Sequence, residues 1–212
     1  MERRKALKNI GLSLGSLTMS SAVVTLIQSC TQEKKVSWNP VFFSPDEADI
    51  VSKTLEVMIP KTPDVPGATD LNLAQFIDGY LDVISTEKEK TAFKAGVEQY
   101  LSTTLEKSGK NVSTDLTEGD IEKRVAHYFK ADAENKKKWN MEVAASEKEG
   151  AQLLSDDAVN FFVLNSLRNR GIEAFKVSKI IGEEVLAYDP IPGAQKGCVD
   201  LQEVSGGRAW SL

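Results

Sequence analysis

The chain has 212 residues, 41% of them hydrophobic and 27% charged, which is the balance of an ordinary globular protein. Its formal net charge is −5, and because residues 1–29 carry four basic residues and one acidic residue, the rest of the chain has a net charge of −8. An acidic body without a basic, aromatic-rich patch is repelled by phosphate backbones, which excludes nucleic-acid binding as an expected function.

The first segment has the features of a bacterial export signal. Arg3 and Arg4 precede a soft apolar run from Ile10 to Ile27, which matches the twin-arginine pattern. Glycine, serine and threonine dilute this run too much for a lasting transmembrane helix, which needs about 20 strongly apolar residues. The twin-arginine route carries folded cargo, so this leader predicts the export of a protein, or of a bound partner, that folds before it crosses the membrane.

The leader ends in Ile27-Gln-Ser-Cys30, which resembles a lipobox, the motif in which a lipid is attached to the cysteine. On this interpretation residues 1–29 are the signal peptide, Cys30 is the lipidated first residue of the mature protein, and residues 30–40 form a polar tether. The body, residues 41–212, is then expected in the periplasm, anchored to a bacterial membrane. The alternative is a cleaved soluble leader in which Cys30 falls by chance.

The body begins with a helix signature. Ser44 and Glu47 form a capping box around Pro45, Pro60 ends the helix, and prolines and glycine make residues 61–70 a loop. Asp70 is expected to cap a second helix with a clear apolar stripe. The members of this stripe, all expected in the core, are Leu73, Phe76, Ile77, Tyr80, Leu81 and Ile84.

Four further segments have helical patterns. They are residues 87–107, which Gly109 ends, residues 117–129, residues 155–170, which Ser155 caps, and residues 172–186. Gly171 is expected to separate the last two helices.

The charged residues 131–150 are interpreted as a helix or a connection, with Trp139 and Met141 as its apolar anchors. No alternating run of β-branched residues predicts a strand. We therefore expect an all-α fold, a single irregular domain of about five to seven helices with an extended Pro/Gly-rich C-terminal arm.

The arm is the most distinctive stretch of the body. Its prolines hold the chain extended and its glycines permit turns, so it either packs as structure or binds a partner. We take it, together with the loop from Pro60 to Asp70, as the candidate docking surface. The candidate docking residues of the arm are Tyr188, Asp189, Pro190, Pro192, Gly193, Gly197 and Cys198.

Few residues offer chemistry. His127 is the single histidine, which excludes a multi-histidine metal site and leaves one candidate base for a serine or cysteine nucleophile. No glycine fingerprint for a dinucleotide, phosphate loop or haem-attachment motif is present. We predict no catalytic, cofactor-binding or metal-binding residue. With Cys30 lipidated, Cys198 has no disulfide partner and is expected to be a buried apolar cysteine or an unpaired thiol at a subunit contact.

Two blocks resemble the gluconate 2-dehydrogenase subunit 3 family, the small or gamma subunit of periplasmic flavoprotein dehydrogenases. In residues 42–78 a capped helix ends in Ile-Pro and is followed by Thr-Pro, Pro-Gly-Ala and Phe-Ile-Asp. Residues 161–198 end in the pattern Leu-x-Tyr-Asp-Pro-x-Pro-Gly-x-x-x-Gly-Cys. Together with the leader, these blocks cover both ends of the chain.

The resemblance implies a non-catalytic accessory subunit of a periplasmic, membrane-associated, FAD-dependent sugar or sugar-acid dehydrogenase. Its implied partners are an FAD-containing catalytic subunit of the glucose-methanol-choline type and often a multihaem cytochrome c subunit, so FAD and haem c would belong to the partners. The catalytic subunit commonly lacks an export signal. Arg3 and Arg4 would therefore export both chains, and Cys30 would anchor them.

Two alternatives remain open at this stage. One is a free-standing helical periplasmic lipoprotein that binds a small ligand or an envelope component, with the family likeness reflecting the fold only. The other is an enzyme that uses His127, which requires this side chain to lie in a pocket near Cys198 or a serine.

Overall fold

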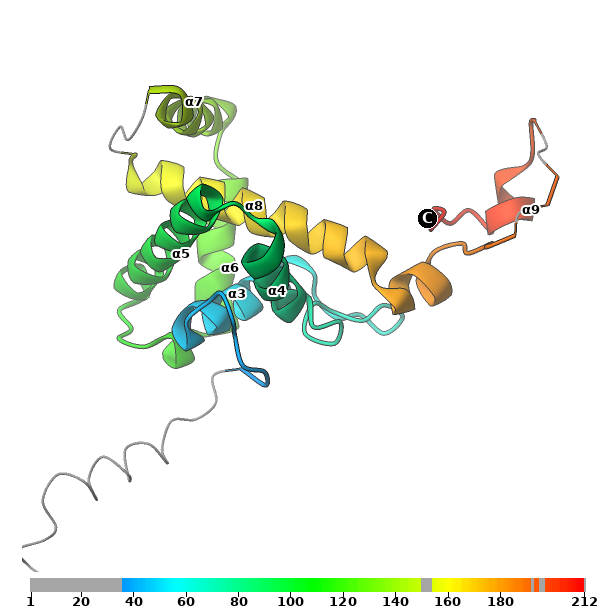
Figure 1. Ribbon diagram of the computed structural model, residues 1–212, viewed down its shortest axis with the longest axis horizontal. Coiled ribbons are helices and arrows are strands. Elements are labelled where there is room, and N and C mark those ends of the chain that lie inside the picture. The colour runs from blue at the N-terminus through cyan, green and yellow to red at the C-terminus, as the bar shows by residue number, and fades with distance from the viewer. Residues whose placement is uncertain (1–35, 150–153, 192, 195–196, 212) are drawn as a thin grey trace, which may run out of the picture. The chain divides into compact units, whose positions relative to one another are not determined.

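The computed structural model describes residues 36–149, 154–191, 193–194 and 197–211. Within these ranges the protein is all-α, as the sequence predicts, and an isolated bridge between Ala187 and Trp210 is the one β contact (Figure 1). The leader, with Arg3, Arg4 and Cys30, lies outside the described residues.

Seven α-helices occur in the described ranges, in agreement with the expected number. They are α3 (Pro45–Met58), α4 (Leu73–Ile84), α5 (Glu87–Ser108), α6 (Glu118–Phe129), α7 (Ala133–Glu149), α8 (Asp156–Val177) and α9 (Leu201–Ser205). A 3₁₀ turn, η1 (Ser113–Asp115), precedes α6, and a π-helical turn, η2 (Ile181–Val185), follows α8.

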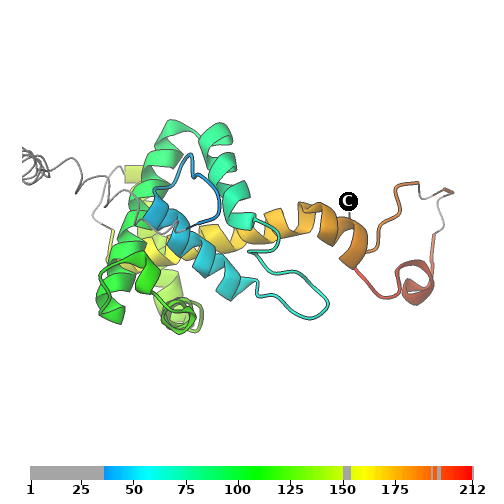
Figure 2. The same cartoon turned by 90° about the horizontal axis from the view of Figure 1, so that it is seen from below.

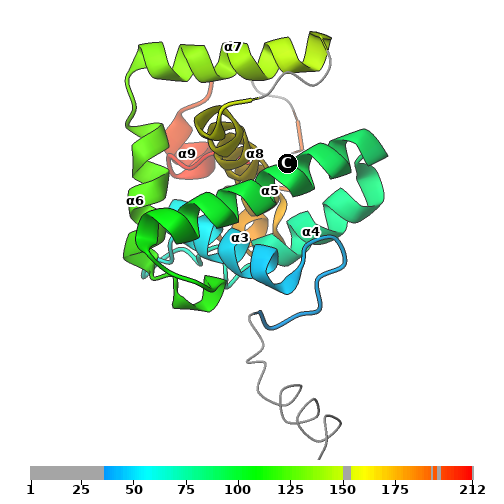
Figure 3. The same cartoon turned by 90° about the vertical axis from the view of Figure 1, so that its left-hand side faces the viewer.

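Helix α8 forms the centre of the core. Helices α3, α4, α5 and α7 all pack against it, and Figure 3, which looks nearly along α8, shows α5 and α7 on different sides of it. A helix surrounded in this way needs apolar residues on several faces. Its fully or nearly fully buried side chains include Ala158, Phe161, Val163, Leu164 and Leu167.

The helix starts follow the predicted capping chemistry. The Ser44 hydroxyl accepts a hydrogen bond from the Glu47 amide, and the Glu47 carboxylate accepts one from the Ser44 amide at 2.7 Å. The same reciprocal pair starts α5 and α6, and Ser155 caps α8. Gly109 ends α5 in the left-handed region at φ 65°, where a residue without Cβ is favoured. The caps of α3 and α8 and the end of α5 confirm the sequence-based predictions, whereas the capping boxes of α5 and α6 were not predicted.

The start of α4 differs from its prediction. Asn72, not Asp70, is the N-cap residue, with φ 53° and no side-chain capping bond. The Asp70 carboxylate instead accepts hydrogen bonds from the Gly67 amide at 3.2 Å and from Lys61 Nζ. The aspartate therefore closes the preceding loop, which Figure 2 shows joining α3 to α4.

Gly171 does not break the helix, contrary to the prediction. Helix α8 continues through it to Val177 and includes the first part of the separate helix expected at 172–186, and η2 covers residues 181–185 of the remainder. A Cβ at Gly171 would lie 2.8 Å from Leu55 Cδ2 and 3.4 Å from Ile59 Cδ1. The close approach of α3 to α8 therefore explains why this position is a glycine. The helix continues through it because an interior glycine costs a helix only about 1 kcal/mol.

The start of the body is fixed to α4 by a buried carboxylate. Asp78, which is 2% exposed, accepts hydrogen bonds from the amides of Val41, Phe42 and Phe43 at 2.7, 3.1 and 2.8 Å. Val36 and Trp38, from the last part of the expected tether, pack against the core. The described residues that precede α3 are thus held against the helical core.

Candidate functional site

The C-terminal arm is solvent-exposed in its described part. Tyr188, Asp189, Pro190, Gly193, Gly197 and Cys198 are all exposed, whereas Pro192 lies outside the described residues. Gly193 has φ 65°, a conformation that glycine favours. Apolar side chains accompany these residues on the same segment, namely Ile191, Val199, Leu201, Val204 and Trp210, each at least 40% exposed.

Backbone hydrogen bonds close the arm into a loop. The Ala187 amide donates to the Ala209 carbonyl, and the Ser211 amide donates to the Ala187 carbonyl, both at 2.9 Å. Asp200 caps α9 within this loop. Cys198 is a free, exposed thiol, so the expectation of a buried apolar cysteine is wrong, because nothing in this loop provides a core to bury it.

The second part of the candidate docking surface, the loop from Pro60 to Asp70, is held by its own hydrogen bonds. The Ala68 amide donates to the Ile59 carbonyl at 2.9 Å, and the Thr69 amide donates to Glu56 at 2.8 Å. The hydrogen bond from the Gly67 backbone amide, followed by that from Lys61, holds the pKa of Asp70 below its usual value. In the described part of the chain, no hydrogen bond joins this loop to residues 188–198.

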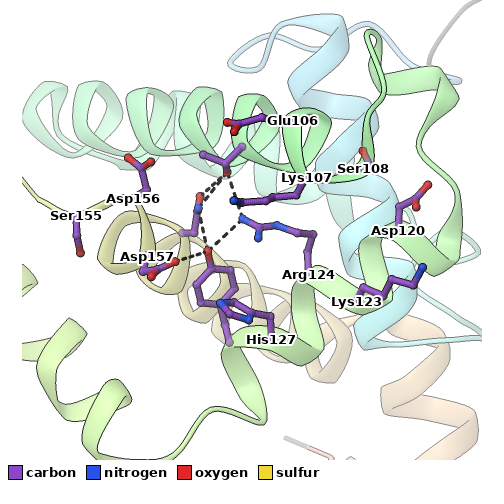
Figure 4. Close-up of a pocket in the computed structure, with 13 residues that line it drawn as sticks. Glu106, Lys107, Ser108, Asp120, Lys123, Arg124, His127, Ser155, Asp156 and Asp157 are labelled. Carbon is purple, nitrogen blue, oxygen red and sulfur yellow. Dashed lines mark hydrogen bonds between the residues drawn. The ribbon is translucent and has the colours of Figure 1, made fainter.

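A polar groove of about 780 Å³ lies between α5, α6 and the first turn of α8 (Figure 4). Its charged side chains have both signs, with basic groups on α5 and α6 and two carboxylates at the start of α8. The charged lining residues are Glu106, Lys107, Asp120, Lys123, Arg124, Asp156 and Asp157.

A hydrogen-bond network around Tyr128 forms the floor of this groove. The buried Tyr128 hydroxyl accepts from Arg124 and from Asn160 Nδ2 and donates to Asp157, each at 3.1 Å. Asn160, which is 1% exposed, also donates to Thr103 at 3.0 Å. Burial raises the pKa of Tyr128, although the bond from Asn160 opposes this effect. Because the hydroxyl already has three partners, it joins α6 to α8 and is a poor proton donor for chemistry.

His127 lies at the edge of the groove and is exposed. Its ring contacts the Tyr128 ring edge-on at a centroid distance of 4.8 Å. The alternative of an enzyme that uses His127 required this side chain to lie near a nucleophile in a pocket. Although Ser108 and Ser155 also line the groove, no hydrogen bond pairs His127 with either in the part described. Likewise, within the residues described, no group of three or more His, Cys, Asp or Glu side chains is arranged to hold a metal ion.

Sequence reasoning missed an apolar pocket between α4 and α8. Phe76 and Tyr80, expected in the core, are 52% and 40% exposed, and with Val177 they border a cavity of about 170 Å³. The sequence feature that could have revealed this pocket is the width of the apolar arc on α4. With Val83 added, this arc exceeds the stripe of about 100° that a single core contact needs. Leu73, Ile77 and Leu81 suffice to face the core, so the others remain outside.

Comparison with known families gives one result. The model of the family described as gluconate 2-dehydrogenase subunit 3 matches residues 45–193, which is more than two thirds of the chain. No curated protein and no solved structure gives a significant match. Among the described helices, none combines the length and the apolar character that crossing a bilayer requires.

Proposed function

Because this chain belongs to the gluconate 2-dehydrogenase subunit 3 family, we propose that it is the non-catalytic accessory subunit of a periplasmic, membrane-associated, FAD-dependent sugar or sugar-acid dehydrogenase. The family match over residues 45–193 is the observation that carries this proposal. The chain serves the export, anchoring and assembly of the flavoprotein subunit. FAD, and haem c where a cytochrome subunit is present, are held by the partners.

The exposed arm supports a docking role. A loop closed by backbone bonds between Ala187 and residues 209–211 presents Tyr188, Ile191 and Trp210 to solvent. Aromatic side chains of this kind are enriched at protein interfaces, where they supply most of the binding energy. The arm, from Tyr188 to Cys198, and the Pro60–Asp70 loop are therefore the surfaces through which the chain holds its catalytic partner.

The leader gives the chain its second task. Arg3 and Arg4 direct the folded complex through the twin-arginine route, and the flavoprotein, folded around its FAD in the cytoplasm, travels bound to this chain. Cys30 then carries the lipid that keeps the complex at the membrane. This arrangement explains why a helical accessory protein has a leader suited to folded cargo.

Co-purification of the native complex tests this function. We expect the tagged full-length chain to retain a second polypeptide with flavin absorbance and sugar or sugar-acid dehydrogenase activity. The same chain produced alone should show neither. A chromophore in the isolated chain, or turnover of substrate without a companion polypeptide, would contradict the proposal.

A small-ligand-binding lipoprotein is the second candidate function, and the polar groove is the observation that favours it. The groove is large enough for a small molecule, since ligand sites usually have volumes of about 300–1,000 Å³, and its charges of both signs suit a polar ligand. Calorimetric titration of the isolated chain with sugars, sugar acids and amino acids separates the two functions, because the accessory role predicts no binding.

A further inference from the structure

Helix α4 exposes a row of apolar side chains that the core does not use. Phe76, Tyr80, Val83 and Ile84 are 52%, 40%, 75% and 62% exposed. Val177 and Ile180, at the end of α8 and just beyond it, add two more exposed apolar side chains at 58% and 42%. Contiguous apolar surface of this kind on a soluble domain marks a binding site.

The pocket within this surface has the size of one side chain. Five of its seven lining residues are apolar or aromatic, namely the exposed Phe76, Tyr80 and Val177 and the buried Ile77 and Ala174, and the other two are charged. Its volume of about 170 Å³ compares with an engineered apolar cavity of about 150 Å³ that accepts benzene. A phenylalanine, leucine or methionine side chain therefore fits it.

A guanidinium group lies at the same pocket. Arg170 is half-buried, and its guanidinium carbon lies 5.6 Å from the centroid of the Tyr80 ring and 5.8 Å from that of Phe93. These cation–π contacts hold the side chain in place, yet in the described part of the chain it makes no hydrogen bond or ion pair. Its donors are thus available, and a planar guanidinium pairs best with a carboxylate.

We propose that the α4–α8 pocket receives one large apolar side chain of the catalytic subunit, while a carboxylate beside that side chain pairs with Arg170. The inference rests on the proposed accessory function and identifies a docking site separate from the arm. Arg170 and the exposed Glu173 are the two charged side chains of the lining, and no described carboxylate forms an ion pair with Arg170. The partner segment is therefore expected to be apolar, with one carboxylate placed to pair with the guanidinium. Fixing the guanidinium in advance reduces the entropy lost on binding.

The test uses the full-length tagged chain co-produced with its flavoprotein, with dissociation constants measured by titration of the purified subunits. Phe76→Asp on α4 and Val177→Asp on α8 place a charge at opposite sides of the pocket rim. We expect each to weaken flavoprotein binding by at least about 30-fold, the effect of losing a central anchor. The matched control is Met141→Asp, an equally exposed apolar position on α7, which should change binding less than about threefold.

Arg170 is tested separately. Arg170→Gln should weaken binding by about tenfold and reduce its dependence on salt, because the charge pairing is removed. Arg170→Lys keeps the charge but loses the planar pairing, so it should retain the salt dependence with weaker affinity. Circular dichroism melting of each free variant shows whether the helical fold is intact. Because the two rim variants lie on different helices, one of them still tests the proposal if the other fails to fold.

The outcomes separate this inference from the proposed function. If the wild-type chain retains no flavoprotein, the accessory function fails and the pocket proposal with it. If the wild-type chain retains the flavoprotein and both rim variants retain it equally well, the pocket proposal is wrong while the accessory function stands. The pocket proposal is also overturned if sedimentation reveals a wild-type dimer that Phe76→Asp dissociates without any effect on flavoprotein binding, since the occupant is then a second copy of this chain.

Discussion

Asp78 joins residues 41–43, which precede α3, to α4, and its removal should be costly. Its carboxylate is buried and accepts three backbone amides from residues 41–43. Asp78→Ala leaves these amides without their acceptor, and unsatisfied buried donors cost about 1–3 kcal/mol each where water cannot replace the partner. We expect the free energy of unfolding, measured by urea denaturation of the full-length chain, to fall by about 3 kcal/mol.

A neighbouring aspartate provides the control. Asp82 lies on the same helix and is exposed, so Asp82→Ala should change the free energy of unfolding by less than about 0.5 kcal/mol. Equal effects of the two substitutions would show that the carboxylate of Asp78 does not anchor residues 41–43.

Tyr100 should make stability depend on alkaline pH. Burial raises the pKa of this phenol to about 12, opposed by its hydrogen bond with Thr54, whereas an unfolded tyrosine titrates near 10. The folded state therefore favours the neutral form. Its contribution is fully present below about pH 10 and is lost as the pH rises from about 10 to about 12. We expect the free energy of unfolding, measured by denaturant titration, to fall by about 2 kcal/mol across this window.

A phenylalanine variant isolates this effect. Tyr100→Phe should make the alkaline fall shallower, because the buried ionisable group is gone, while the raised pKa of Tyr128 leaves part of the fall in place. An identical pH profile in Tyr100→Phe would assign the dependence to other groups.

At the scale of the elements, two helical glycines predict opposite effects of the same substitution. Gly171→Ala adds a Cβ 2.8 Å from Leu55, which is fully buried, and overpacking of this kind costs about 1–3 kcal/mol. Gly79→Ala on α4 meets no atom within 4 Å and should gain up to about 1 kcal/mol from the higher helix propensity of alanine. Thermal and urea unfolding measure both.

The sign of each change is the criterion. A stabilised Gly171→Ala chain would show that α3 and α8 separate easily, contrary to their packing. A destabilised Gly79→Ala chain, measured in isolation so that no partner can contact α4, would show that the added Cβ does not fit at this position.

The sequence predicts the helices well where local chemistry defines their ends. The capping pairs at Ser44 and Ser155 and the glycine at position 109 fix boundaries through contacts within a few residues, and the structure confirms them. The prediction fails at Gly171 because the reason for that glycine is Leu55, which is more than a hundred residues away in the chain. Local propensity carries no information on such a contact.

The candidate site is less predictable for a related reason. An apolar stripe indicates which residues avoid water, but it does not say whether the core or a partner covers them. Phe76 and Tyr80 therefore share a pattern with Leu73 and Ile77 and differ from them only in what packs alongside. The prolines and glycines of the arm predict its irregular backbone. The closure of the arm by the bridge between Ala187 and Trp210 could not be predicted, because no local motif links these two positions.

At the scale of the whole molecule, the predicted functions are arranged along the chain. Export and anchoring are predicted for residues 1–30, the described body begins at Val36, and the exposed apolar surfaces lie on α4, at the end of α8 and in the arm. If the accessory role is correct, the signals that move the complex and the surfaces that hold it are separate. The export and anchoring signals can then be removed without disrupting the surfaces that bind the partner.

Replacing Arg3 and Arg4 by lysine should therefore block export without affecting assembly. The positive charge is kept but the twin-arginine pair is lost, so we expect both this chain and the dehydrogenase activity to remain in the cytoplasm, still bound to each other. Activity assays on periplasmic and cytoplasmic fractions, followed by co-purification from the cytoplasm, measure both properties. Unchanged periplasmic activity would contradict the escort role.

Cys30→Ala should release an otherwise intact complex from the membrane. The lipobox-like sequence that ends at Cys30 predicts a lipid on this residue. Removing the thiol should therefore move the chain and its dehydrogenase activity from the membrane fraction to the soluble fraction after cell lysis. Cys198→Ala, which changes the exposed thiol of the arm, is the matched control and should leave fractionation unchanged. If Cys30→Ala stays with the membrane, attachment occurs through the partner subunits and the lipobox interpretation is wrong.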